Sequence, residues 1–111
     1  MPAHDDWMKI DGGTVTLQGN LGTQEIPVLQ QTLDQLDRDG HKDITIDLVN
    51  VDYLSSSYLG IIARAAADAE KRGGTLRLIV IGQVLRLIKL AGLDKVVALE
   101  KPQGWQAPPI D

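Results

Sequence analysis

The amino-acid sequence predicts an α/β fold, in which helices cover a mostly parallel sheet of four to five strands that begins with an antiparallel hairpin. Stretches of β-branched and other apolar residues alternate with stretches whose apolar side chains recur at a helical period. Glycines mark most boundaries between these stretches. The predicted order is β-β-α-β-α-β-α-β, in which right-handed crossovers would join the parallel strands.

The first elements are a hairpin and a helix. Residues 7–10 and 14–18 alternate between apolar and polar side chains, and the Asp-Gly-Gly of residues 11–13 is typical of a turn because glycine accepts positive φ. Residues 19–23 predict a loop. The following apolar side chains recur at spacings of three and four, which predicts an amphipathic helix ending at Gly40. This stripe consists of Ile26, Leu29, Leu33 and Leu36.

The rest of the chain alternates strands with helices. The predicted elements are strands at residues 44–51, 76–81 and 95–99 and helices at residues 59–69 and 84–91. This alternation is typical of parallel strands joined by crossover helices. Residues 1–100 are therefore interpreted as a single domain, and residues 101–111, which are rich in proline and glycine, as an irregular tail.

Composition excludes several classes of function. The 111 residues carry 11 Lys and Arg against 15 Asp and Glu, so the net charge of −4 gives no electrostatic reason to expect a nucleic acid or an anionic membrane as partner. The absence of cysteine excludes disulfides and thiolate metal sites. Neither a signal peptide nor an apolar run of membrane-spanning length is found. These features predict a cytoplasmic protein that is not directly inserted in a membrane.

Residues 55–57, three consecutive serines, stand between a predicted strand and a predicted helix. Nucleophilic catalysis by serine needs a base, but His4 and His41 lie in a predicted tail and a polar turn, and the Gly-x-Ser-x-Gly pattern is absent. Neither a phosphate-binding Gly-Lys-Ser/Thr loop nor a cluster of metal ligands is present. The sequence therefore predicts no catalytic residue, no metal site and no cofactor.

Two roles for the serines stay open. A serine at a helix N-terminus can cap the helix, which stabilises it by about 1 kcal/mol. A serine there can also accept a phosphate, because the positive end of the helix dipole and the free amide groups offset the added negative charge. The residues alone do not distinguish a cap from a phosphorylation site.

Three segments resemble the STAS domain family, the anti-sigma factor antagonists of bacterial partner-switching systems. They are Leu54–Gly60 (LSSSYLG), Gly73–Gly82 (GGTLRLIVIG) and Leu87–Val97 (LIKLAGLDKVV), and the resemblance extends over about residues 15–99. It implies that Ser56 is the phosphoacceptor, with Ser57 and Ser55 as alternates. It also implies that the unphosphorylated form binds an anti-sigma factor that is itself a serine kinase, that the phosphorylated form releases this partner, and that a phosphatase restores binding.

The chain departs from the family pattern around this site. Ser55 replaces the acidic residue before the acceptor, Gly19-Asn20-Leu21-Gly22 replaces a Gly-Glu-Leu-Asp loop, and Tyr58 replaces a glycine where a partner would approach. The family's C-terminal amphipathic helix is missing, which predicts an apolar sheet surface for the tail, a dimer mate or a partner to cover. The expected partner-binding residues are Asn20, Leu21, Gly22, Thr23, Ser55, Ser56, Ser57, Tyr58 and Arg64.

Together these features predict a regulatory binding protein rather than an enzyme: an anti-sigma factor antagonist that serine phosphorylation switches. The alternative is a STAS adaptor that is not phosphorylated and serves as a subunit of a transporter or a signalling complex. Formation of a homodimer is left open.

Overall fold

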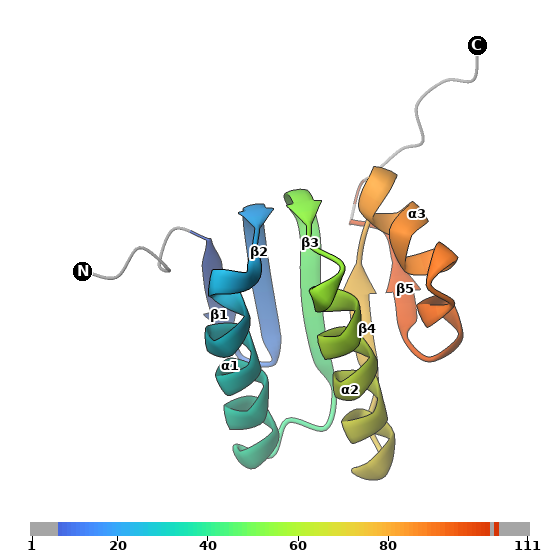
Figure 1. Cartoon of the computed structure of the whole chain (residues 1–111). Coiled ribbons are helices and arrows are strands. Elements are labelled where there is room, and N and C mark those ends of the chain that lie inside the picture. Colours follow the sequence, from blue (N-terminus) through green and yellow to red (C-terminus); the bar gives the residue numbers. More distant parts are fainter. Residues whose placement is uncertain (1–6, 103, 105–111) are drawn as a thin grey trace.

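The structure, a computed structural model, describes residues 7–102 and 104 and contains one five-stranded sheet (Figure 1). The strands lie side by side in chain order: β1 (Met8–Asp11), β2 (Thr14–Leu21), β3 (Ile44–Leu54), β4 (Leu76–Ile79) and β5 (Ala98–Glu100). The β1–β2 pair is antiparallel and the other three pairs are parallel. The predicted α/β fold with an N-terminal hairpin is confirmed. The predicted tail lies mostly outside the described residues.

The helices α1 (Ile26–Arg38), α2 (Ser57–Lys71) and α3 (Gly82–Leu90) connect the parallel strands and lie on one face of the sheet (Figure 1). Short 3-10 turns, η2 (Thr23–Glu25) and η3 (Leu93–Lys95), precede α1 and β5. A single face follows from the topology, because each right-handed crossover advances in the same direction across the sheet.

Several strand ends differ from the predicted ends: β3 continues to Leu54 rather than ending at residue 51, and β4 ends at Ile79 rather than at residue 81. Two further differences concern β2 and β5. Residues 19–21, predicted as a loop, belong to β2 because β2 continues to pair with β3 as far as Leu21 and Leu54. Residues 95–97, predicted as strand, precede β5, which begins only at Ala98, where pairing with β4 starts. In both places the pairing partner, rather than the local pattern, determines where the strand begins or ends.

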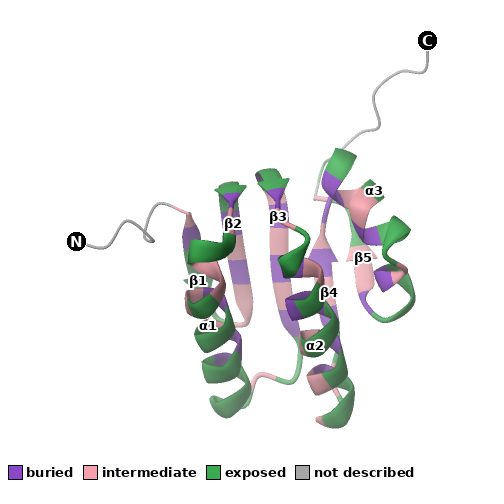
Figure 2. Cartoon of the chain, viewed as in Figure 1, coloured by how far each residue is buried: buried purple, intermediate pink, exposed green. Residues whose placement is uncertain are grey.

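The core lies between the sheet and the three helices. Its central row crosses four strands through Val15, Ile46, Leu78 and Leu99, and buried side chains of α1, α2 and α3 pack against the sheet. Figure 2 colours the buried positions of the strands and helices purple. The buried helical residues are Leu29, Leu33, Leu36, Tyr58, Ile61, Ile62, Ala66, Ala69, Val84 and Ile88.

The opposite face of the sheet is mainly polar. One row across it consists of Thr14, Thr45, Arg77 and Ala98, and the next of Thr16, Asp47, Ile79 and Glu100. Arg77 and Glu100 form an ion pair of 2.8 Å on this face. The prediction of an apolar sheet surface in need of cover is therefore wrong. Threonine and charged side chains let this face meet water without a further helix.

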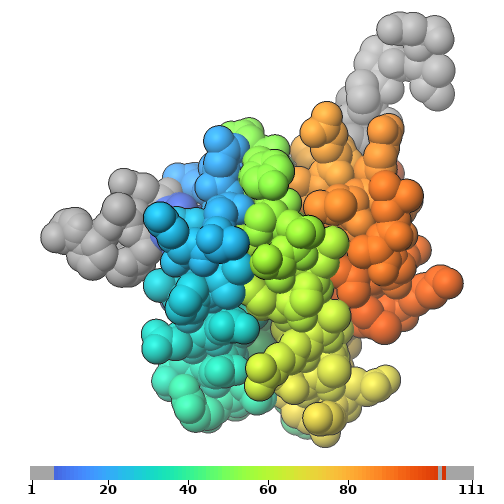
Figure 3. All heavy atoms as spheres, viewed as in Figure 1, coloured from blue at the N-terminus to red at the C-terminus, as the bar shows by residue number. Residues whose placement is uncertain are grey.

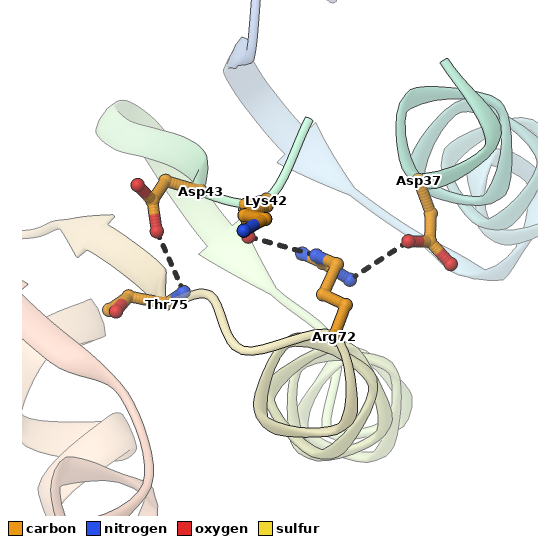
Figure 4. Close-up of polar contacts among 5 residues, drawn as sticks. All are labelled: Asp37, Lys42, Asp43, Arg72 and Thr75. Carbon is orange, nitrogen blue, oxygen red and sulfur yellow. Dashed lines mark hydrogen bonds and ion pairs between the residues drawn. The ribbon is translucent and has the colours of Figure 1, made fainter. Parts of the chain in front are cut away.

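Polar contacts fix the end of the sheet at which β3 and β4 begin (Figure 4). Arg72, which follows α2, donates from Nε to the carbonyl oxygen of Lys42 at 2.8 Å and pairs with Asp37 of α1 at 3.4 Å. The Thr75 amide donates to the Asp43 carboxylate at 2.9 Å. These contacts tie the C-terminal ends of the two longer helices to each other and to the sheet.

Candidate functional site

The carboxyl ends of β2 and β3 bring the two predicted site segments together. Leu21 and Leu54 are paired, and the amide of Ser55 donates to the carbonyl of Leu21 at 3.2 Å. In the space-filling view, the segment that follows β2 (blue) and the one that follows β3 (green) lie in contact at this end (Figure 3). Loops that follow the strands of a rigid sheet often carry binding residues.

The serine cluster forms the start of α2. Ser56 occupies the N-cap position with helical φ and ψ of −60° and −22°, and its side chain makes no capping hydrogen bond. The first turn is closed instead by the amides of Tyr58 and Leu59, which donate to the carbonyls of Ser55 and Ser56, each at 3.0 Å. The capping role considered for one serine is therefore not found. In this tight turn, the amide groups that would donate to a capping side chain already donate to backbone carbonyls.

The three serines differ in exposure. Ser56 and Ser57 are exposed, whereas Ser55 is only partly exposed. The Ser55 hydroxyl oxygen is buried and has no hydrogen-bond partner in the structure. Ser56 and Ser57 are thus the accessible hydroxyls of the cluster.

Tyr58 is buried, with only 1% of its surface exposed. Its hydroxyl donates to the carbonyl of Gly22 at 2.7 Å, which joins α2 to the segment after β2. Burial raises the pKa of Tyr58 to about 12, and the nearby charge of Glu25 adds to the rise. The expectation that this side chain faces an approaching partner is wrong, because its ring fills the core beneath the serines.

The segment between β2 and α1, residues 22–25, is called the β2–α1 turn below. Its Gly22 amide donates to the Glu25 carboxylate at 3.0 Å, half of a capping box. Asn20 and Thr23 are exposed and Gly22 is partly exposed. Leu21 has only 1% of its surface exposed, so its predicted place on the partner surface is corrected: its side chain points into the core.

Arg64 lies on α2, seven residues beyond Ser57, or about 10 Å along the helix at 1.5 Å per residue. It is exposed and lines a shallow groove between α1 and α2. The other residues that line this groove are Gln30, Leu33, Asp34, Ile61, Ala65 and Asp68. The structure therefore places Arg64 about two helical turns away from the serine cluster rather than within it.

Sequence reasoning missed Tyr53, whose side chain is 58% exposed next to the serines. Regular alternation would place Tyr53 on the same face as the buried Val51. The register with β2 shifts between the pairs Gly19–Val51 and Asn20–Tyr53, so β3 contains an extra residue at Asp52. This bulge turns Tyr53 outward beside Asn20.

Two further observations concern only the described residues. Within them, no three His, Cys, Asp or Glu side chains gather as metal ligands would. Across the same residues, every helix is too short or too polar to cross a membrane.

Comparisons with known proteins agree on one family. The family model described as "Mlab, STAS domain" matches residues 8–100. The chain is 30% identical over 92 residues to the anti-sigma-B factor antagonist of Bacillus subtilis (strain 168), covering 81% of this chain and 84% of that protein. It is 29% identical over 84 residues to the anti-sigma-B factor antagonist of Staphylococcus aureus (strain NCTC 8325 / PS 47), covering 75% and 78%. The crystal structure of an anti-sigma factor antagonist from Mycobacterium paratuberculosis matches with a TM-score of 0.74 at 27% identity, covering 86% of this chain and 84% of that chain.

Proposed function

This chain belongs to the STAS domain family, and on that premise we propose that it is an anti-sigma factor antagonist. It acts as a regulatory binding protein rather than an enzyme. Its partner is an anti-sigma factor that is also a serine kinase, and phosphorylation of Ser56 switches the binding. A phosphatase restores the binding form.

The observation that carries this proposal is the state of Ser56. It is an exposed serine at the N-terminus of a long helix, and its hydroxyl is not used as a cap. A kinase can therefore reach it without unfolding the helix. The helix dipole stabilises a phosphate at this position by up to about 1–2 kcal/mol. Ser57 is also exposed and remains the alternate acceptor, whereas the hydroxyl of Ser55 is buried.

The partner would contact what we call the serine surface. It consists of the exposed side chains of Asn20, Thr23, Asp52, Tyr53, Ser56 and Ser57. Tyrosine is enriched among the residues that dominate binding energy, so Tyr53 is the expected anchor. Phosphate adds a charge of about −1.5 to −2 to this surface, which already carries Asp52. Desolvation of that charge in a close-packed interface explains release of the partner.

The first test is phosphorylation. Co-expression with the cognate serine kinase, followed by mass spectrometry, should place one phosphate on Ser56, and Ser56→Ala should remove it. Phosphate found on Ser57 would assign the switch to the alternate acceptor. If residues 55–57 carry no phosphate and the kinase does not bind, the proposal is wrong.

The second test is binding of the partner, measured by calorimetry. Ser56→Ala should bind as tightly as the unphosphorylated chain, and Ser56→Asp and Tyr53→Ala should each weaken binding at least about tenfold. Gln83→Asp is the matched control, since it adds the same charge at an exposed position in the first turn of α3. If the partner binds stably and Ser56→Asp does not weaken its affinity, the result would favour the alternative, a STAS adaptor that is not phosphorylated.

A further inference from the structure

We propose that Tyr58 is a positioning residue that couples the serine cluster to the β2–α1 turn, so that a negative charge at Ser56 changes the conformation of that turn. The proposal rests on the proposed function only for the source of the charge, which is phosphorylation. The coupling itself is a property of this chain and can be measured without a partner.

Tyr58 makes hydrogen bonds to both segments. Its amide donates to the carbonyl of Ser55 at 3.0 Å, within the first turn of α2. Its hydroxyl donates to the carbonyl of Gly22 at 2.7 Å, within the β2–α1 turn. Its ring is buried between these two ends. Because packed interiors resist deformation, a shift of the helix turn would pass through the ring to Gly22.

A charge at Ser56 has a reason to move the first turn. The amides of Tyr58 and Leu59 are committed to the carbonyls of Ser55 and Ser56. A negative group on Ser56 competes for these donors, since anions are stabilised by amides at a helix N-terminus. The backbone of Tyr58 therefore moves when the charge arrives.

The β2–α1 turn is held by contacts that such a movement would disturb. Gly22 accepts from Tyr58 and donates to the Glu25 carboxylate at 3.0 Å. Glu25 is close enough to Tyr58 for its charge to act on the phenol. A movement of Tyr58 that weakens its hydrogen bond to Gly22 therefore loosens the turn next to the exposed Thr23 and Gln24.

The experiment measures amide hydrogen exchange of the full chain by NMR. Ser56→Asp should raise the exchange of the Gly22 amide, which donates to Glu25, by roughly fivefold, the effect of losing one hydrogen bond. In Tyr58→Phe, which keeps the ring and removes the hydroxyl, exchange should already be raised, and Ser56→Asp should add little. The same response to Ser56→Asp with and without the hydroxyl would overturn the coupling.

Two variants complete the test. Thr32→Val is the matched control, because it removes another hydroxyl-to-carbonyl bond, from Thr32 to Val28 at 2.9 Å, and should leave the response intact. If Tyr58→Phe does not fold, Glu25→Gln tests the same link. This variant removes the charged acceptor of the Gly22 amide, so exchange there should already be raised and Ser56→Asp should add less. An unchanged response would count against the coupling. Failure to bind a kinase would sink the proposed function alone, since this readout uses no partner.

Discussion

Tyr53 and Tyr58 stand close together in the sequence and occupy opposite environments. Tyr53 is 58% exposed and Tyr58 is 1% exposed. A buried phenol needs a hydrogen-bond partner, and Gly22 supplies it. The exposed phenol has no such constraint and is available to a partner. Under the proposals above, Tyr53 would contact the partner and Tyr58 would position the turn beneath it.

The raised pKa of Tyr58 predicts a loss of stability at high pH. The folded-state pKa of about 12 exceeds the ordinary value of 10.0, so the fold favours the neutral phenol. This contribution is complete below pH 10 and is lost as the pH rises through 12. Urea unfolding between pH 9 and pH 11.5 should show a steeper decline in the free energy of unfolding for the native chain than for Tyr58→Phe. Tyr53→Phe, the control, should decline like the native chain, and parallel curves for all three would contradict the prediction.

Two glycines predict opposite effects of the same substitution. A Cβ atom on Gly74 would collide with the backbone carbonyl of Lys42, whereas one on Gly60, within α2, would meet nothing. Gly74→Ala should therefore cost about 1–3 kcal/mol of unfolding free energy, and Gly60→Ala should add about 0.5–1 kcal/mol. Urea denaturation measures both. If the Gly74→Ala chain were as stable as the native one, the prediction would be wrong. The segments that precede β3 and β4 would then be able to move apart at no cost in free energy.

At the scale of elements, periodicity predicted the helices better than the strands. The apolar stripe from Ile26 to Leu36 lies on the buried face of α1, as predicted. The helical period can be read within one segment of the sequence, without knowledge of a pairing partner. Strand β3 was harder to predict, since its bulge depends on the register with β2. That bulge decides that Tyr53 is exposed, which alternation alone could not show. Family resemblance located Leu21 and Tyr58 at the site but gave no information on which way their side chains point.

The two contacts of Arg72 differ in how much they stabilise the ends of α1 and α2. Its side chain is 16% exposed and that of Asp37 is 46% exposed. The ion pair is therefore screened by water and contributes little, whereas the bond to the Lys42 carbonyl anchors the helix end to the sheet. Arg72→Ala should lower the unfolding free energy by about 1–2 kcal/mol, and Asp37→Ala by at most about 0.5 kcal/mol. Urea unfolding of both variants checks this, and equal losses would mean that the ion pair dominates.

Across the whole molecule, the two ends of the sheet differ in structure. Where β3 and β4 begin, Arg72 and Gly74 tie the helices and strands together. At the carboxyl ends of β2 and β3, the exposed side chains gather over the buried Tyr58. A rigid end and an exposed end on one scaffold are typical of proteins that bind through their loops.

The last prediction concerns which C-terminal residues the fold needs for its stability. Among residues 7–102 and 104, every buried apolar residue of the core lies between Met8 and Val97, and the helix-free face of the sheet is mainly polar. A chain shortened after Pro102 should therefore keep its unfolding free energy to within about 0.5 kcal/mol. A chain shortened after Val97 loses β5 and its pairing with β4, so it should be strongly destabilised. Urea unfolding and light scattering of both chains test the boundary. A loss above about 1 kcal/mol, or new self-association, in the longer chain would show that residues beyond Pro102 contribute to the fold.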